Sequence, residues 1–254
     1  MKIINIKGFN LAYTRHGKGT PLVLIHGYPL DHNIWNDMLP LLENDFDVIM
    51  PDLRGFGESD VVESQYKISD MASDIADLLD SLSIEKAFVV GHSMGGYISL
   101  AFARAYSQRV LGLGLVSSQA IADTLERQQG RYASAAEILK TGIGPVSESF
   151  PALLSPDQKV QILVRDLIAK QSPAGLASAL KAMAERDDSS SILSGFGFPV
   201  AIVHGDADSL IPIQRAREIN DAIPNSNLLE LPDVGHMPMM ESPKAVVSVL
   251  KNML

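Results

Sequence analysis

The sequence predicts an α/β fold: a mostly parallel eight-stranded sheet with helices on both faces and an inserted helical cap. Three observations support this class. Short apolar runs alternate with segments of helical periodicity as far as Ser117, a pattern typical of a parallel sheet covered on both faces. The alternation stops between Ser118 and Phe198. It then resumes and continues to the end of the chain.

The expected strands are short runs of apolar or alternating residues. They lie at residues 2–7, 10–16, 21–26, 46–50, 87–90, 110–116, 200–204 and 228–231. The first two alternate polar and apolar side chains on either side of Gly8, so we expect an antiparallel hairpin at the edge of the sheet. The later runs, such as PLVLIH, are continuously apolar, as in strands that are buried on both faces.

Helices are expected to connect these strands. They lie at residues 32–43, 66–82, immediately after Ser93, and at 212–223 and 243–254. Asp31 is suited to cap the first of them, because its carboxylate can accept hydrogen bonds from the unpaired N–H groups there. In the second helix, Ile68, Met71 and Ile75 fall on one face of a 3.6-residue period.

The middle of the chain has a different character. Between Ser118 and Phe198, prolines and glycines separate several helical stretches, and no run resembles a strand. Because a connection of this length is rarely without structure, we expect a helical cap over the carboxyl edge of the sheet. The predicted boundaries are 1–118 and 199–254 for the core and 119–198 for the cap.

Composition limits the possible partners. The 254 residues are 46% hydrophobic, which is sufficient for one large core, and the formal net charge is −9. This charge argues against nucleic acid and anionic membrane as partners, since both require a basic surface. There is no cysteine, which excludes a thiol nucleophile and a thiolate metal site. We expect a cytoplasmic protein that acts on a small molecule without a cofactor or metal, because no signal peptide or membrane span is visible.

Ser93 is the first candidate catalytic residue. It lies in Gly91-His92-Ser93-Met94-Gly95, between a predicted strand and a predicted helix. This is the G-x-S-x-G nucleophile elbow, in which a tight turn projects the serine hydroxyl above the sheet. The N-terminus of the following helix would favour negative charge beside the serine. The alternative is a chance match, in which the glycines only permit close packing.

Asp208 and His236 are the predicted partners of this serine. A serine hydroxyl needs an adjacent base, and the base needs a carboxylate to orient it. His236 follows the last predicted strand and Asp208 follows the strand before it, so the order along the chain is serine, aspartate, histidine. Asp206 competes for the acid role, and either aspartate could merely cap the helix near Pro212. We favour Asp208 because the longer loop lets it turn toward the histidine.

Two backbone N–H groups are predicted to form an oxyanion hole. One belongs to Met94, the residue after the serine, and the other most plausibly to Tyr28, in the loop after PLVLIH. Gly27 would let that loop approach closely. The side chains of Met94 and Tyr28 are expected only to pack the pocket walls.

With these motifs in place, the sequence resembles the α/β-hydrolase superfamily over essentially its whole length. The resemblance rests on HGYP at 26–29, DLRGFGES at 52–59, GHSMGG at 91–96, GDAD at 205–208 and GH at 235–236. It is most similar to the small esterase, enol-lactonase and haloperoxidase-like branch, which implies a four-helix cap and a structural role for the loop containing Arg54. Dehalogenases and most epoxide hydrolases of the superfamily use an aspartate where this chain has Ser93.

These observations favour a carboxylesterase-like serine hydrolase that cleaves small carboxylic esters or lactones. Two alternatives are a ligand-sensing receptor with slow turnover and a lyase that reuses the triad, the latter with a cap lysine such as Lys140, Lys170 or Lys181. Apolar cap residues that could line the pocket, or equally form the core of the cap, are Ile121, Leu125, Tyr132, Ile138, Phe150, Leu153 and Leu154. The sequence does not define the natural substrate or the oligomeric state.

Overall fold

The computed structural model describes residues 1–62 and 64–253. Within this part of the chain, eight strands form one sheet in the order β1-β2-β4-β3-β5-β6-β7-β8. The strands are β1 (Lys2–Ile6), β2 (Phe9–Gly17), β3 (Thr20–Ile25), β4 (Phe46–Pro51), β5 (Ala87–His92), β6 (Val110–Val116), β7 (Val200–Gly205) and β8 (Asn227–Leu231). Strand β2 runs antiparallel to β1 and β4, and all other neighbours are parallel. The predicted fold class is therefore confirmed.

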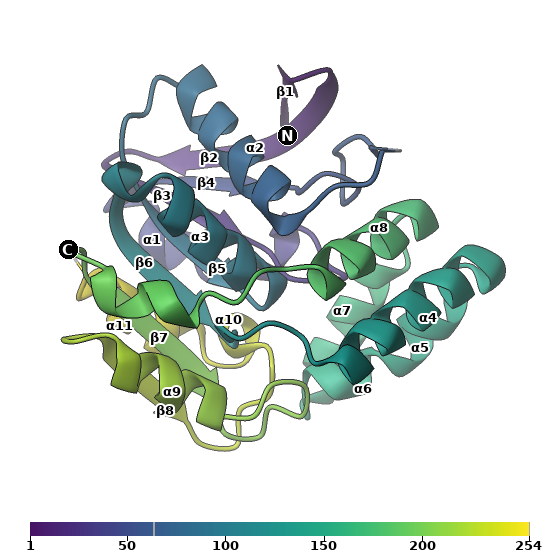
Figure 1. The fold of residues 1–254 in the computed structure, drawn as a ribbon. Coiled ribbons are helices and arrows are strands. Elements are labelled where there is room, and N and C mark those ends of the chain that lie inside the picture. The colour runs from purple at the N-terminus through teal and green to yellow at the C-terminus, as the bar shows by residue number, and fades with distance from the viewer. Residues whose placement is uncertain (63, 254) are drawn as a thin grey trace.

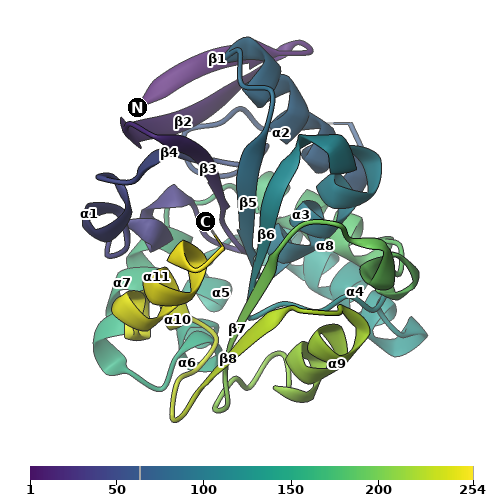
Figure 2. The same cartoon turned by 90° about the vertical axis from the view of Figure 1, so that its left-hand side faces the viewer.

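Helices cover both faces of the sheet (Figure 1). One face carries α2 (Ile68–Ser81), α3 (Met94–Ala105) and α9 (Gln214–Ala222), and the other carries α1 (Leu39–Leu42), α10 (Pro238–Glu241) and α11 (Pro243–Lys251). Figure 2 shows these two layers on either side of the sheet. The apolar face predicted for α2 is buried, since Ile68, Met71 and Ile75 all belong to the core. None of the helices formed by the described residues combines the length and the hydropathy that a bilayer span requires.

The helix predicted at residues 32–43 is wrong as a single element. The segment forms a 3-10 turn, η1 (His32–Trp35), and the separate short helix α1. Pro40 explains the break, because inside a continuous helix it would lose its hydrogen bond to residue 36 and clash with that carbonyl. At the start of α1 the missing N–H costs nothing. Asp31 does act as a cap, since its side chain accepts from the N–H of Asn33.

The C-terminal region also differs from the prediction. Helix α10 was not expected, because its four residues are too few to show a helical period. The closing helix was predicted to reach Leu254, whereas α11 ends at Lys251, and Leu254 lies outside the described residues.

A group of helices lies between β6 and β7, where the sequence predicts the cap. These are α4 (Leu125–Thr141), α5 (Gly144–Ser149), α6 (Pro151–Leu154), α7 (Gln158–Ile168) and α8 (Pro173–Ala184), followed by the 3-10 helix η3 (Ser190–Gly195). In Figure 1, α4 to α8 gather beyond the carboxyl ends of the central strands. We call α4 to α8 the cap. The domain boundaries given above stay a prediction.

Gln171 links the cap to the core. Its amide nitrogen donates to Oδ2 of Asp31 at 3.1 Å, and its amide oxygen accepts from the N–H of Gly57 at 3.0 Å. Gly175 of α8 also touches the same loop, because a Cβ there would lie 1.9 Å from the carbonyl oxygen of Gly55. The cap therefore rests directly on the glycine-rich loop that follows β4.

The loop at 51–59 has the structural role that the resemblance implies. Arg54 forms two hydrogen bonds to the carboxylate of Asp74 in α2, at 2.5 and 2.6 Å, and its guanidinium lies over the Tyr66 ring. Such a bidentate pair fixes the orientation of the guanidinium as well as its position. The loop is thereby fastened to α2 beneath the cap.

The elbow between β5 and α3 is strained and tightly packed. Ser93 has φ 52° and ψ −112°, a conformation that non-glycine residues rarely adopt and that persists only where the surroundings impose it. A Cβ at Gly91 would lie 2.1 Å from the carbonyl oxygen of Gly95, and one at Gly95 would lie 2.2 Å from that of Ile25. The two glycines are therefore required by the close approach of β3, β5 and α3.

We predict that Gly95→Ala lowers the free energy of unfolding by roughly 1–3 kcal/mol, the usual cost of overpacking a rigid site. The clash is with the backbone of β3, which cannot move aside as a flexible side chain can. Urea unfolding followed by circular dichroism would measure the change.

The matched control for this prediction is Gly130→Ala. Gly130 lies in the exposed part of α4, and no atom would come within 4 Å of a Cβ there. This substitution should instead stabilise the protein by about 0.5–1 kcal/mol, since alanine favours a helix over glycine. Equal effects of the two substitutions would refute the packing argument.

Candidate active site

The carboxylate of Asp208 is buried and accepts three hydrogen bonds. Its Oδ1 accepts from the N–H groups of Leu210 and Ile211, at 2.9 and 3.0 Å. Its Oδ2 accepts from Nδ1 of His236 at 2.6 Å. Nε2 of His204 lies 3.2 Å from the same oxygen and donates its hydrogen bond to the carbonyl oxygen of Ile211 at 2.8 Å. Burial raises the pKa of Asp208, but His236 and the other donors outweigh it and hold the pKa well below its usual range. Asp208 is therefore ionised throughout the neutral and mildly acidic range.

His236 follows β8, and its backbone is held from two directions. Its N–H donates to the carbonyl oxygen of Leu154 in the cap at 2.8 Å. Its carbonyl oxygen lies 2.8 Å from Nε2 of His92, which donates. Burial lowers the pKa of His92 well below its usual value, and the nearby His236 lowers it further. His92 is therefore a neutral imidazole that fixes the backbone of its neighbour.

Glu241 holds the same loop on both sides of His236. Its two carboxylate oxygens accept from the N–H groups on either side of His236, those of Gly235 at 2.9 Å and Met237 at 3.2 Å. Burial raises the pKa of Glu241, while these two N–H groups act in the opposite direction. The loop that carries His236 is thus fastened before and after the histidine.

Ser93 and His236 line the same cavity. Because Nδ1 of His236 is engaged with Asp208, Nε2 is the ring nitrogen left to exchange a proton with a group in the cavity. Asp206, the competing acid, is exposed, and its Oδ1 accepts from the N–H of Asp233 at 2.7 Å. The structure thus brings Asp208, and not Asp206, to the histidine.

Tyr28 and Met94 carry the two N–H groups predicted for the oxyanion hole. Within the described part of the chain, neither N–H donates to a protein acceptor. Met94 begins α3 directly after Ser93, and Tyr28 lines the cavity, with its ring packed edge-on against Phe56 and Phe150. Both groups are therefore available to a ligand atom beside Ser93.

The cavity has a volume of about 340 Å³. Its walls are formed by Tyr28, Ser93, Tyr97, Arg127, Gly130, Arg131, Ser134, Phe150, Leu180, Met183, Leu210, Ile211 and His236. Helices α4 and α8 and the loop after β7 supply most of the walls. A smaller cavity of about 150 Å³ shares Tyr97 with it but contains neither Ser93 nor His236.

Most of the apolar cap residues suggested by the sequence are not part of this cavity. Only Phe150 lines it. Leu125, Tyr132 and Leu153 are exposed, Ile138 and Leu154 belong to the core, and Ile121 is half-buried. A helical period separates apolar from polar faces, but it does not show which face meets the cavity. None of Lys140, Lys170 and Lys181, the residues considered for a lyase, is among the residues that line it.

His92, His204 and Glu241 were not singled out from the sequence. Each is a polar side chain within five residues of a predicted site residue. That proximity was the available signal. Residue type and position alone do not reveal which buried atoms a side chain will meet.

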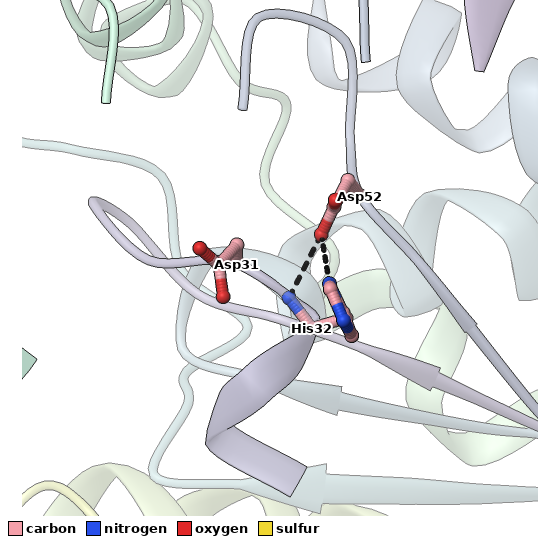
Figure 3. A group of neighbouring side chains, drawn as sticks. All are labelled: Asp31, His32 and Asp52. Carbon is pink, nitrogen blue, oxygen red and sulfur yellow. Dashed lines mark hydrogen bonds and ion pairs between the residues drawn. The ribbon is translucent and has the colours of Figure 1, made fainter. Parts of the chain in front are cut away.

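Asp31, His32 and Asp52 form a second cluster, in which the potential metal-binding atoms lie within 4.8 Å of one another (Figure 3). Oδ1 of Asp52 accepts from the backbone N–H and from Nδ1 of His32, at 2.9 and 2.7 Å. Its Oδ2 accepts from the backbone N–H of Glu58. The carboxylate of Asp31 accepts from the backbone N–H of Asn33 and from the side-chain amide of Gln171. Protein donors thus already use these oxygens. We interpret the cluster as a structural link between the loops after β3 and β4, and the absence of a metal stays a prediction.

The His32–Asp52 pair should make stability depend on pH. Burial lowers the pKa of His32, but the hydrogen bond and the charge of Asp52 outweigh it and raise the pKa above 6.5. A raised pKa in the folded state stabilises the protein fully below the unfolded value and ceases to do so as the pH rises through the folded value. We predict that the free energy of unfolding decreases from pH 6 upward and that His32→Gln removes this step. Urea unfolding at a series of pH values would measure it.

His16→Gln is the matched control, because His16 lies on β2 and makes no side-chain hydrogen bond among the described residues. The His16→Gln variant should retain the decrease in the free energy of unfolding above pH 6. An identical pH dependence in wild type and His32→Gln would contradict the assignment.

Comparisons with known proteins agree with this fold. A family model of the alpha/beta hydrolase fold matches residues 20–243. The chain is 32% identical over 238 residues to the dihydrolipoyllysine-residue acetyltransferase component of the acetoin cleaving system of Pseudomonas putida. That match covers 90% of this chain and 61% of the relative, so the chain spans less than two thirds of the relative's length.

Two solved structures are similar over nearly the whole chain. A thermophilic esterase from Thermogutta terrifontis, with malate bound, has a TM-score of 0.95 at 33% identity, covering 99% of this chain and 97% of that one. The enol-lactonase from Burkholderia xenovorans LB400 has a TM-score of 0.92 at 23% identity, covering 99% of each chain. Because its identity to this chain is only 23%, the enol-lactonase is evidence for the fold alone.

Proposed function

The chain belongs to the α/β-hydrolase family, and from this premise we propose that it is a serine hydrolase of small carboxylic esters or lactones. The observation that carries the proposal is the 2.6 Å contact between Asp208 and Nδ1 of His236, at the wall of a cavity that also contains Ser93. The similarity to a solved esterase at 33% identity supports the choice of esters.

In the proposed mechanism, Ser93 attacks the ester carbonyl carbon and transfers its proton to Nε2 of His236. Asp208 keeps the imidazole in the tautomer that accepts at Nε2 and balances the charge of the imidazolium. The N–H groups of Met94 and Tyr28 donate to the oxyanion of the tetrahedral intermediate. His236 then gives its proton to the leaving alcohol, which leaves an acyl group on Ser93. A water molecule deprotonated by His236 releases the acid.

Three further residues position this machinery. His204 donates from Nε2 to the carbonyl oxygen of Ile211 and lies 3.2 Å from Oδ2 of Asp208, so it holds the loop that carries the carboxylate. His92 and Glu241 hold the backbone around His236. Because a misplacement of about 1 Å can cost a factor of 10² in rate, these contacts matter for turnover although none reaches the cavity.

We predict that Ser93→Ala reduces kcat/KM for p-nitrophenyl esters by about 10⁴-fold or more, as in other enzymes of this mechanism. A panel of esters of increasing chain length, together with lactones, would define the acyl preference. Unchanged cleavage of p-nitrophenyl acetate by a folded Ser93→Ala variant would exclude the proposal.

A pair of aspartate variants tests the acid. Asp208→Asn should lower kcat by about 10⁴-fold, because an amide cannot balance the imidazolium and favours the wrong tautomer. Asp206→Asn makes the same chemical change two residues away, at a carboxylate whose one hydrogen bond among the described residues comes from the backbone N–H of Asp233. It should keep near wild-type turnover in the same p-nitrophenyl ester assay. The opposite ranking would transfer the role to Asp206.

A further inference from the structure

The charge of the cavity wall is opposite to that of the whole chain. The formal net charge is −9, yet the residues that line the cavity include Arg127 and Arg131 and neither an aspartate nor a glutamate. Both arginines come from α4 and lie four positions apart, so they are neighbours on one face of the helix. The wall opposite the core therefore carries a localised positive charge.

Asp123 is the counter-charge nearest these arginines, and it is shared. This buried carboxylate bonds to Arg131, lies 2.8 Å from the guanidinium of Arg186, and lies 3.9 Å from that of Arg127. Burial raises the pKa of Asp123, but Arg131 and Arg186 outweigh it and lower the pKa. One carboxylate thus serves three guanidinium groups, which leaves two positive charges without a partner among them.

Arg186 is already satisfied within the protein. It donates to the carbonyl oxygens of Met183 and Ile121 at 2.9 and 2.8 Å, and its guanidinium lies 4.2 Å from the centre of the Tyr97 ring. It does not line the cavity. Of the three guanidinium groups, that of Arg127 lies farthest from Asp123, at 3.9 Å, and it lines the cavity beside Arg131.

These two arginines retain donors for a ligand. The side chain of Arg127 is 45% exposed, and its hydrogen bond to the carbonyl of Leu210 is long, at 3.5 Å. Arg131 points two of its nitrogens at Asp123 and at the sulfur of Met183, the second at 3.5 Å. A guanidinium carries five N–H donors in a planar fork, so both groups have N–H bonds left to donate.

We propose, on the basis of the esterase function above, that the substrate carries a carboxylate in addition to its scissile ester or lactone. The ester lies at Ser93 and His236, and the carboxylate is bound by Arg127 and Arg131 on α4. The apolar side chains of Leu180, Met183 and Leu210, which line the same cavity, contact the hydrocarbon between the two groups. Half-esters of dicarboxylic acids and carboxylate-bearing lactones have this chemistry.

A carboxylate suits this wall better than a larger anion. The planar fork of arginine matches the two oxygens of a carboxylate, and the cavity of about 340 Å³ is otherwise largely apolar. A low-dielectric wall also strengthens the attraction between the arginines and an anion, compared with an exposed surface. The charge would both select the substrate and orient its ester toward Ser93.

Two esters of equal chain length test the proposal: mono-p-nitrophenyl glutarate, which is anionic, and p-nitrophenyl pentanoate, which is neutral. The measured quantity is the ratio of their kcat/KM values. Wild type should prefer the glutarate ester, and Arg127→Gln should lower the ratio about tenfold, as expected for the loss of one charge-assisted hydrogen bond. Raising the salt concentration should also lower the wild-type ratio, because ions screen the attraction.

Arg165→Gln is the matched control. Arg165 lies on the exposed side of α7 in the same cap, away from the cavity, so this variant changes the net charge equally and should leave the ratio unchanged. A ratio that is the same in wild type, Arg127→Gln and Arg165→Gln would overturn the proposal. If wild type cleaves the pentanoate through Ser93 but does not prefer the glutarate ester, this inference fails alone. If neither ester is cleaved, the proposed function fails.

A binding measurement provides a readout without turnover. Calorimetry with glutarate and the Ser93→Ala protein should show binding that weakens about tenfold when Arg127→Gln is added, since the arginine contact does not require Ser93. Inorganic phosphate is the comparison anion. Tighter binding of phosphate than of glutarate would overturn the choice of a carboxylate, and no binding of either would overturn the anion site.

Discussion

The buried carboxylate of Asp208 is the constraint on which the candidate site depends. An ionised carboxylate removed from water is costly unless its oxygens are hydrogen-bonded, and here three donors meet it. They come from two places: the loop after β7 and the loop after β8. Displacing either loop would leave one carboxylate oxygen without a hydrogen-bond donor. The two loops therefore have one favourable arrangement, and His236 is oriented by it.

The elbow and the histidine loop are joined through His92. Its Nε2 donates to the carbonyl of His236, while Gly27 packs so closely on the other side that a Cβ there would lie 2.5 Å from its Nδ1. Gly27 precedes Tyr28, whose N–H is the proposed second oxyanion donor. The buried imidazole of His92, directly before the strained turn of Ser93, thus contacts both the loop that carries Tyr28 and the loop that carries His236. The positive φ of Ser93 persists because these neighbours leave the turn no room to relax.

The sequence predicted the sheet well because its physical signal is local. A strand buried on both faces must be apolar at successive positions, and β3 and β5 show this directly. The order of Ser93, Asp208 and His236 predicted which loops would meet, since parallel strands end at one edge. Tertiary packing decided the rest. The period of α4 could not reveal that Arg127 and Arg131 face the cavity, and no pattern indicated that His204 would meet Asp208.

The cap does more than enclose the cavity, because it also braces the proposed base. The carbonyl of Leu154 in α6 accepts from the N–H of His236, and a Cβ on Gly235 would lie 2.6 Å from Pro156. Lifting the whole cap would break the hydrogen bond between Leu154 and His236 and release the loop that carries His236. A path of substrate entry that leaves α6 in place avoids this loss. Arg127, half-exposed on α4, lines the cavity and is also accessible to solvent. An anionic substrate would then meet its binding group at the entrance, before its ester reaches Ser93.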